Sequence, residues 1–591
     1  PEGGEVVVVR AYMAHHQGMS LVALANVLLG GTVQGLFHAD PSVRAVELLL
    51  QERMPHHAEV ARPRAEEVTA AARVLDMVPA VARRFSSPHH PVPPTHLLSN
   101  GRYSVMLTAA GSGYSRRHDL AVTRFREDVT RDAWGAYFFL RDARSGRVWS
   151  AGYQPSGLEA DSYQALFSEE RAEISRRDGA VTTTMEVVVS AEDDAEVRRL
   201  TIANLGTGAR EIEVTSYAEV VLTSPAADAA HPAFSNLFVQ TEVVPGRDAL
   251  LATRRPRSVT DAPVWAAHVV AGEVPALGGL QYETDRARFL GRGRSIRTAA
   301  AVMDGRPLSD TVGPVLDPIF SLRRRIRLPA GSSARLTFTT LLAGSREEAL
   351  DLVDKYHDPT IFDRTLTLAW TQAQVQLHHL GVEPEEARAF QQLAGGLLYP
   401  DPSLRPLPEV LERNRGSQSG LWRHGISGDL PIVLVRIDQP EERRIVRDLL
   451  RAHEYWRLKG LEVDLVIINE KPGSYAQDLQ ATIEELVRAS GSRLGHEAHR
   501  AHGSVFIVRG DQLTMEDRDL LQTAARAVLL SRHGSLADQV LRRPKPPLPE
   551  APVSPKPAPA KPEVGGALPR PELEFWNGLG GFAADGKEYV V

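Results

Sequence analysis

Residues 97–342 carry the feature that most restricts the fold: short segments in which apolar and polar residues alternate, with turn signals between them. An alternation with a period of two places the apolar side chains of each segment on one face of a sheet. Glycine-containing turns such as Gly111-Ser112-Gly113 and Asp178-Gly179 separate the segments. We therefore predict a large antiparallel β-sandwich over residues 97–344. The alternating segments include residues 102–108, 135–140, 181–189, 197–204, 210–217 and 332–341.

Helical periodicity precedes this region. Apolar residues recur at helical spacing from residue 11 to about 29, Gly30-Gly31 ends that helix, and residues 43–54 form a second amphipathic segment. Two such helices bury their apolar faces only against further helices. We expect residues 1–54 to be the closing pair of a helical domain, so that the chain begins inside a domain. Residues 55–96, with their Pro-rich end, are expected to be a linker.

Helical spacing returns after residue 345. Apolar runs at 430–437, 463–469 and 505–509 lie among the helical segments, so residues 345–542 are predicted to be a helical or mixed α/β connector. Residues 543–572 are a Pro-rich linker, and residues 573–591 resemble the first strand and turn of a further domain. The predicted fold class is α+β and multidomain, with a large antiparallel β-sandwich flanked by helical segments.

Composition excludes several classes of function. The 591 residues carry a formal net charge of -6, which gives no general reason to bind nucleic acid. The chain has no Cys, which excludes thiol catalysis, disulfides and thiolate metal sites within it. No stretch has the roughly 18 consecutive apolar residues of a membrane span, and the first residues show no signal-peptide pattern.

The run Tyr12-Met13-Ala14-His15-His16-Gln17-Gly18 is the first candidate binding feature. Adjacent residues on a helix point about 100° apart, so His15 and His16 are poorly placed to ligate one metal. We expect one of the two to hydrogen-bond a sugar or a catalytic carboxylate at the mouth of a helical barrel while the other packs, and Gln17 is a further candidate for sugar binding. The alternative is a histidine pair that packs between helices.

A second candidate is the hairpin of residues 97–117, which concentrates Gly, Ser and Tyr. Tyr103 and Tyr114 offer ring faces for sugar C–H groups, and the Arg117 guanidinium can bond two sugar oxygens. These three residues are predicted to contact a carbohydrate. The same residues would also suit an ordinary β-hairpin.

Asp429 is a weak candidate for a catalytic acid, because it lies between a Gly-rich turn and an apolar run. Glycoside cleavage requires a second carboxylate, and spacing alone identifies none. A turn or capping role is the alternative. No segment matches a phosphate-binding loop, so no cofactor and no metal are predicted.

Several long motifs resemble the cyclic β-1,2-glucan synthases, and the resemblance covers nearly the whole chain except the Pro-rich tether. It implies a multidomain bacterial membrane enzyme with a UDP-glucose-dependent glycosyltransferase region, a glucoamylase-like (α/α)6 region that closes the ring, and a cellobiose-phosphorylase-like region that trims chain length with phosphate. The motifs lie at residues 12–21, 38–41, 47–53, 97–154, 229–240, 282–292, 425–437 and 578–591.

On that map, residues 1–54 correspond to the last helices of the cyclising region and residues 97–344 to a phosphorylase-type sandwich. Residues 573–591 correspond to the start of a second phosphorylase-type domain. The glycosyltransferase motifs, the carboxylates expected just before the His-His-Gln-Gly-Met run and the acid of the downstream phosphorylase barrel are missing. An independent activity of this chain is therefore in doubt.

The main functional hypothesis is a part of a cyclic β-1,2-glucan synthase that contributes a carbohydrate-contacting sandwich and scaffold. Its expected partners are β-1,2-glucan, bound weakly, and the remaining domains of the same polypeptide. The parent enzyme is expected at the cytoplasmic side of the bacterial inner membrane, and this segment to be soluble. The alternatives are a self-sufficient glycoside phosphorylase or hydrolase that uses Asp429, and a structural spacer without sugar affinity.

Overall fold

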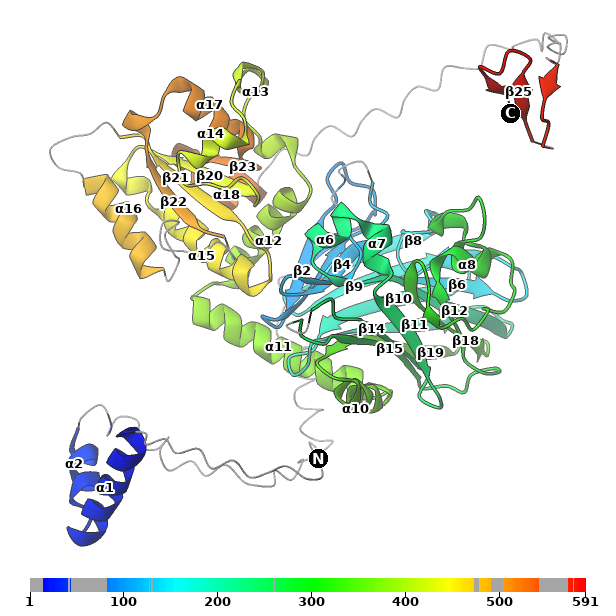
Figure 1. The fold of residues 1–591 in the computed structure, drawn as a ribbon, viewed down its shortest axis with the longest axis horizontal. Helices are drawn as coiled ribbons and strands as arrows, with labels where there is room; N and C mark the ends of the chain where they lie inside the picture. Colours follow the sequence, from blue (N-terminus) through cyan, green and yellow to red (C-terminus); the bar gives the residue numbers. More distant parts are fainter. Residues whose placement is uncertain are drawn as a thin grey trace. The chain divides into compact units, whose positions relative to one another are not determined.

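The computed structural model describes residues 14–40, 43, 82–126, 128, 131–258, 261–471, 478–490, 503–541, 572–577 and 579–590. The chain divides into two compact units, Pro1–Val78 and Pro79–Val591. The second unit contains the sandwich and a smaller α/β module (Figure 1).

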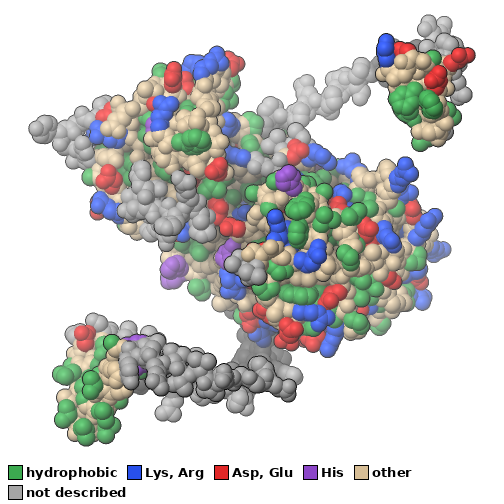
Figure 2. Space-filling model, in the orientation of Figure 1, with side chains coloured by type: hydrophobic (Ala, Val, Ile, Leu, Met, Phe, Trp, Pro, Cys, Tyr) green, Lys and Arg blue, Asp and Glu red, His purple; other side chains and the backbone are tan. Residues whose placement is uncertain are grey.

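The described part of the first unit is a pair of helices, α1 (Ala14–Leu28) and α2 (Thr32–Ala39). Gly30 and Gly31 adopt positive φ angles of 60° and 79°, which end α1 as the sequence indicates. Neither helix has a buried residue, and Val27 is 80% exposed. Apolar side chains accordingly cover much of this helix pair in Figure 2. Apart from residue 43, the predicted second helix at residues 43–54 lies outside the described residues.

No single described helix is both long and apolar enough to cross a membrane. The pair α1 and α2 meets that length and composition test only when taken together, and it is bent by 104°.

The first sheet of the second unit has ten strands, and every neighbouring pair is antiparallel. Its spatial order is β1 (Arg83–Phe85), β8 (Ser162–Phe167), β9 (Arg171–Asp178), β10 (Val181–Val189), β11 (Ala195–Asn204), β19 (Ser333–Ala343), β15 (Trp265–Gly272), β14 (Ala249–Arg254), β13 (Val239–Val244) and β17 (Gly313–Pro314).

The second sheet has nine strands and faces the first across an apolar core. Phe138 and Phe338, one from each sheet, place their ring centroids 4.8 Å apart in that core. The predicted antiparallel sandwich is therefore confirmed. The spatial order is β16 (Gln281–Asp285), β18 (Pro318–Leu328), β12 (Arg210–Thr223), β5 (Leu120–Thr123), β4 (Gly113–Arg117), β3 (Tyr103–Thr108) and β2 (Thr95–Ser99); β6 (Tyr137–Asp142) also pairs with β12, and β7 (Val148–Ser150) pairs with β6.

The sandwich begins earlier than the sequence pattern indicates. Strand β1 lies within residues 55–96, which were expected to be a linker, and pairs with the edge of the first sheet. The Arg83 guanidinium is buried and donates to the Thr95 carbonyl at 2.7 Å. A three-residue strand followed by prolines carries no periodicity of its own, and its pairing depends on contacts distant in sequence.

Short helices lie between the sandwich strands, and two longer helices follow the last strand. Helix α10 packs against β15 and β19, where Val353 and Tyr356 are buried. The helices are α6 (Pro225–Ala230), α7 (Pro232–Asn236), α8 (Arg286–Leu290), α9 (Ala300–Met303), α10 (Arg346–Tyr356) and α11 (Ile361–Leu380).

Residues 384–541 form the α/β module, which is built on a four-stranded parallel sheet. The three predicted apolar runs are strands of this sheet, and near-continuous apolar sequence is typical of parallel strands buried on both faces. The spatial order is β22 (Val505–Arg509), β21 (Asp464–Asn469), β20 (Ile432–Ile437) and β23 (Ala527–Leu530). The helices are α12 (Pro384–Leu398), α13 (Pro408–Arg413), α14 (Gln418–Trp422), α15 (Arg444–Leu458), α16 (Asp478–Ala489), α17 (Met515–Ala524) and α18 (Leu536–Leu541).

The module packs directly on strands β2–β4 of the sandwich. Leu97, Met106 and Tyr114 belong to the same apolar cluster as Trp456 of the module. The Gln391 side chain of α12 accepts from the Leu97 backbone N–H at 3.0 Å and donates to the Leu97 carbonyl at 2.9 Å. The sandwich and the module therefore share a core and backbone-directed hydrogen bonds.

The last described element is a small antiparallel sheet of β24 (Leu573–Glu574), β25 (Gly581–Ala583) and β26 (Tyr589–Val590). Phe582 and Tyr589 pack edge to face, with ring centroids 5.0 Å apart.

Candidate functional site

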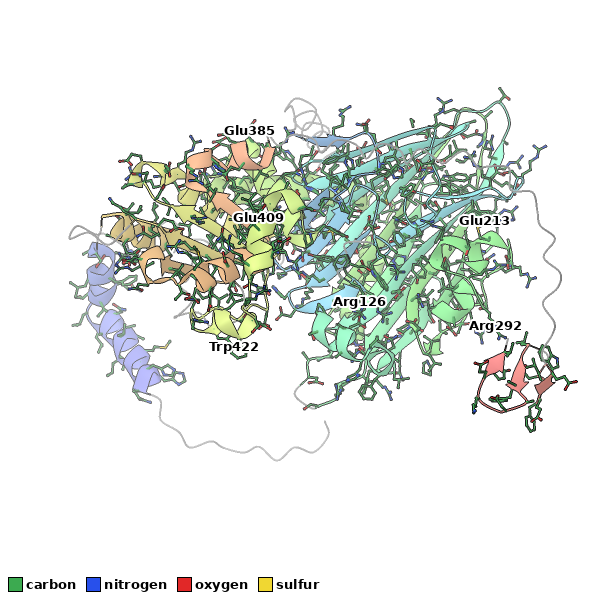
Figure 3. All side chains as sticks on the ribbon, turned by 90° about the horizontal axis from the view of Figure 1, so that it is seen from above. Arg126, Glu213, Arg292, Glu385, Glu409 and Trp422 are labelled. Atoms are coloured by element: carbon green, nitrogen blue, oxygen red, sulfur yellow. The ribbon has the colours of Figure 1, made fainter. Side chains whose placement is uncertain are left out.

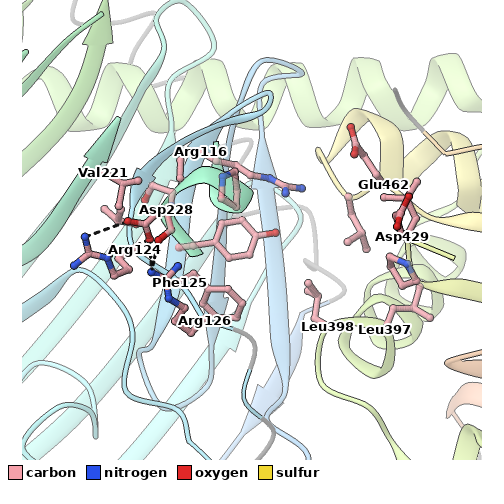
Figure 4. Close-up of a pocket in the computed structure, with 18 of the residues that line it drawn as sticks. Arg116, Arg124, Phe125, Arg126, Val221, Asp228, Leu397, Leu398, Asp429 and Glu462 are labelled. Atoms are coloured by element: carbon pink, nitrogen blue, oxygen red, sulfur yellow. Dashed lines mark hydrogen bonds and ion pairs between the residues drawn. The ribbon is translucent and has the colours of Figure 1, made fainter. Parts of the chain in front are cut away.

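A cavity of about 410 Å³ lies between the sandwich and the module. Its sandwich wall comes from β4, β5 and the residues just after β5, whereas its module wall comes from the turns that precede β20, β21 and β23. Figure 4 shows the two walls facing each other. Both walls contribute lining residues that can contact a polar ligand: Tyr114, Arg116, Arg126, Asp429, Glu462 and Arg526.

Tyr114 and Arg116 share one face of β4 because side chains two residues apart point the same way. The Arg116 guanidinium carbon lies 5.1 Å from the Tyr114 ring centroid, and Phe125 packs edge to face on that ring at 5.2 Å. The buried Arg116 Nε has no hydrogen-bond partner in the part of the chain that the structure describes. Among the described residues Arg116 forms no ion pair, and Figure 4 shows its side chain extending toward the module. It is the cation most available to a ligand in this cavity.

The Arg124 guanidinium, by contrast, is used entirely in ion pairs within the protein. Its guanidinium contacts the carboxylates of Glu219 at 2.6 Å, Asp228 at 3.2 Å and Asp317 at 3.2 Å. Burial opposes the charge, but the carboxylates of Glu219 and Asp228 outweigh it and raise the pKa of Arg124. This ionic network fixes α6 to the sandwich and forms a rigid rear wall.

Asp429 projects from the module into the same cavity. Its carboxylate accepts from Gln418 Nε2 at 3.1 Å, and its backbone N–H donates to Ser427 Oγ at 3.2 Å. The side chain is exposed. Asp429 therefore makes hydrogen bonds within its turn and also lines the cavity.

A buried carboxyl lies in the neighbourhood of Asp429. Burial raises the pKa of Asp464 to about 6, the Ser504 backbone N–H opposes this shift, and the charge of Asp429 adds to it. Asp464 Oδ1 accepts the Ser504 N–H at 3.0 Å. Asp464 does not line the cavity, so it influences a ligand there only through Asp429.

Trp422 is a further exposed aromatic residue close to Asp429 that sequence reasoning missed. Its indole N–H donates to the Ser427 carbonyl at 3.3 Å, and its ring is 62% exposed. Figure 3 shows it at the surface of the module. Its position on the short helix α14, before a Gly-rich turn, carries no periodicity that would distinguish an exposed ring from a core ring.

The hairpin residues predicted to bind sugar are divided between two faces. Tyr103 has no exposed surface, its hydroxyl donates to Glu196 at 3.3 Å, and burial raises its pKa well above the ordinary value. Arg117 forms an ion pair with Asp194 at 2.7 Å and lines a different cavity. Tyr114 lines the cavity but is only 8% exposed. The alternation along β3 and β4 therefore removes Tyr103 and Arg117 from this site.

His15, His16 and Gln17 lie on α1 in the first unit, where all three side chains are exposed. The His15 and His16 ring centroids are 4.1 Å apart. Within the part of the chain that the structure describes, no three His, Asp or Glu side chains are grouped so that they could hold a metal ion.

Comparison with known proteins assigns the sandwich to a family. Residues 79–359 match the family described as glycosyl hydrolase 94, supersandwich domain. The whole chain is 41% identical over 607 aligned residues to the cyclic β-(1,2)-glucan synthase NdvB of Rhizobium meliloti (strain 1021), of which it covers 21%. It is 24% identical to the N,N'-diacetylchitobiose phosphorylase of Vibrio furnissii, over 46% of this chain and 34% of that protein.

Similarity to solved structures is low. A bacterial glucoamylase complexed with acarbose aligns over 55% of this chain and 42% of its own, at 9% identity and a TM-score of 0.33. The chain spans about a fifth of the synthase and about a third of the phosphorylase. The resemblance stated from the sequence motifs is confirmed: over its whole length the chain is similar to part of a cyclic β-(1,2)-glucan synthase, and its sandwich matches the glycosyl hydrolase 94 supersandwich domain.

Proposed function

We propose that the cavity between the sandwich and the module holds a segment of β-(1,2)-glucan during glucan synthesis, cyclisation and phosphorolytic length control by the parent enzyme. The observation that carries this proposal is that Arg116 and Asp429 line the same cavity from opposite walls. Arg116 has no ion-pair partner among the described residues. Guanidinium and carboxylate groups bond the hydroxyls of neutral sugars, and exposed rings stack on sugar C–H faces. Trp422 would extend the same surface outside the cavity.

The geometry favours binding over glycoside cleavage. A general acid for cleavage is typically held in a buried setting, whereas Asp429 is exposed and its carboxylate accepts from Gln418. The chain alone is therefore expected neither to transfer glucose from UDP-glucose nor to release glucose 1-phosphate from β-(1,2)-glucan with phosphate. Phosphate-dependent turnover that Asp429→Asn abolishes would favour the alternative of a self-sufficient phosphorylase.

Calorimetric titration of the chain with linear β-(1,2)-glucan tests the proposal. A few solvent-exposed hydrogen bonds and one ring contact give a net gain of a few kcal/mol, so we expect a dissociation constant of about 1 mM. Asp429→Asn and Arg116→Gln should each weaken binding several-fold. Arg117→Gln is the matched control, because it alters the next residue of β4, which lies outside the cavity.

Two results would overturn this proposal. Equal weakening by Arg116→Gln and Arg117→Gln would mean that the cavity is not the binding site. No heat of binding at tens of millimolar glucan would leave the sandwich and module as a structural spacer.

We further propose a domain assignment for the remaining residues. Residues 1–54, including His15, His16 and Gln17, would complete a glucoamylase-like (α/α)6 region, and residues 573–591 would begin a second phosphorylase-type domain. The partners of this chain would then be the other domains of the synthase, at the cytoplasmic side of the inner membrane. The exposed apolar side chains of α1 and α2 support this assignment, because they require a covering surface.

A further inference from the structure

A second cavity, of about 640 Å³, lies on the sandwich beside α6 and α7. Helix α6 separates it from the first: Pro225 and Asp228 line the first cavity, whereas Ala227 and Ala230 line the second. In Figure 2, apolar and basic side chains lie together over this part of the sandwich. The lining of this cavity includes His231, Phe234, Ser235, Arg254, Arg255 and Arg257.

Three guanidinium groups that line this cavity gather around the ring of Phe238, which itself lies outside the lining. The guanidinium carbons of Arg254, Arg255 and Arg257 lie 5.3, 5.8 and 5.5 Å from the Phe238 ring centroid. Arg257 also lies 5.6 Å from the ring centroid of Phe234. Cation–π contacts of this kind orient a guanidinium but leave its charge uncompensated.

None of these three arginines forms an ion pair with a carboxylate among the described residues. Arg254 Nη1 donates to the Ser235 carbonyl at 3.0 Å, and Arg255 Nη2 donates to the Leu237 carbonyl at 3.1 Å. Each of these two guanidinium groups therefore keeps donors that the described residues do not use.

The nearby carboxylates are occupied elsewhere. Asp261, the one acidic residue among the described residues that line this cavity, accepts the backbone N–H groups of Arg257 at 2.8 Å and Ser258 at 3.1 Å. Asp228 is held by Arg124 and Arg126 on the other side of α6. Burial, followed by the positive charge of Arg257, lowers the pKa of Arg254 despite both carboxylates. Among the described residues, three arginines without an ion-pair partner thus face one carboxylate across this cavity, while the fourth arginine of the lining, Arg117, pairs with Asp194.

One polar side chain at this cavity also has no partner. Ser235 is 5% exposed, and its hydroxyl makes no hydrogen bond to the described residues. Because Ser235 lines the cavity, this hydroxyl is a further donor for a ligand there. The apolar lining, which includes the half-exposed Phe234 ring, would receive an organic group.

We propose that this cavity binds a phosphate group, either as the free ion or as the ester of a small organic molecule. Guanidinium forks match the oxygen geometry of phosphate, and a dianion relieves the mutual repulsion of clustered cations. The volume of the cavity is within the usual range for small-molecule sites. The inference is independent of the proposed glucan cavity, since the two share no lining residue.

The test uses the whole chain and two probes, inorganic phosphate and phenyl phosphate, titrated at constant ionic strength against chloride. We expect binding of inorganic phosphate in the millimolar range, and tighter binding of phenyl phosphate if Phe234 receives the organic group. Loss of one charge-assisted contact in Arg257→Gln should weaken both by about tenfold. Arg292→Gln, which alters an exposed arginine elsewhere on the sandwich (Figure 3), is the matched control.

Equal affinity of the Arg257→Gln and Arg292→Gln variants would overturn the proposal, as would no binding of either probe above the chloride baseline. The second result would favour an acidic protein surface as the partner of these arginines. Phenyl phosphate binding no tighter than inorganic phosphate would assign the cavity to the free ion. Titration of Arg257→Gln with β-(1,2)-glucan separates the two proposals, because glucan affinity should not change.

Discussion

The two cavities on either side of α6 differ in how their charges are compensated. In the first, Arg124 is surrounded by three carboxylates and cannot serve a ligand. In the second, three arginines cluster on a ring without a carboxylate partner among the described residues. Arginine content alone therefore does not identify a binding site. An arginine whose charge is balanced by carboxylates of the protein has a structural role, whereas an arginine without such partners is available to bind a ligand.

The largest effect expected from this contrast is on stability. Arg124→Met would remove the most buried cation that contacts the carboxylates of Glu219 and Asp228, and should lower the free energy of unfolding by about 3 kcal/mol. Arg126→Met, which removes a more exposed partner of Asp228, should cost only about 1 kcal/mol. Thermal unfolding of both variants measures the difference. Equal losses would contradict a structural role specific to Arg124.

The next effect concerns Asp464, an uncompensated carboxyl near the first cavity. Native Asp464 keeps its proton up to about pH 6, whereas the unfolded chain releases it near pH 4. The unfolded chain therefore binds fewer protons between these values, and stability falls as the pH rises through that window.

Asp464→Asn removes this loss and can still accept the Ser504 N–H. The substitution should change the free energy of unfolding more favourably at pH 7.5 than at pH 4, by up to about 3 kcal/mol. Melting temperatures of the two proteins across this range provide the measurement. If the difference in melting temperature between the two proteins does not vary with pH, Asp464 is ionised in the native protein throughout this range.

A smaller effect is expected at the second cavity. Arg257→Gln removes one of three like charges, so in phosphate-free buffer of low ionic strength it should stabilise the protein by roughly 0.5 kcal/mol. Salt at about 1 M should abolish the gain by screening. Destabilisation at low salt would mean that an unrecognised anionic partner already compensates this arginine.

The smallest effect on stability is expected at Trp422. Because its ring is exposed, Trp422→Ala should change the free energy of unfolding by less than about 0.5 kcal/mol. Loss of a ring–sugar contact should nevertheless weaken glucan binding about five-fold. The control is Leu407→Ala, which alters another exposed residue of the module. Trp456→Ala would not serve, because the Trp456 ring is buried. Unchanged glucan affinity would confine binding to the cavity itself.

The sandwich was predictable from the sequence because alternation and turn residues are local signals that persist over many strands. The α/β module was predicted only as helical or mixed. Its strands read as plain apolar runs such as residues 432–437, which periodicity cannot separate from buried helix. Strand β1 was missed because only its pairing with β8 defines it.

The candidate site was predictable only in part. The sequence identified the hairpin that carries Tyr114, and the turn that carries Asp429. It did not reveal that the module covers one face of that hairpin, which selects Tyr114 and Arg116 and buries Tyr103 on the other face. The choice between these faces is made by packing between segments almost 300 residues apart, such as Leu97 and Gln391.

The paired hydrogen bonds between Gln391 and Leu97 have a further consequence. Strand β2 is an outer strand of its sheet, and an open strand edge is a template for pairing with another molecule. The Gln391 amide occupies both the N–H and the carbonyl of Leu97, as a neighbouring strand would. The helix that joins sandwich to module thereby also protects the sheet edge against intermolecular strand addition and aggregation.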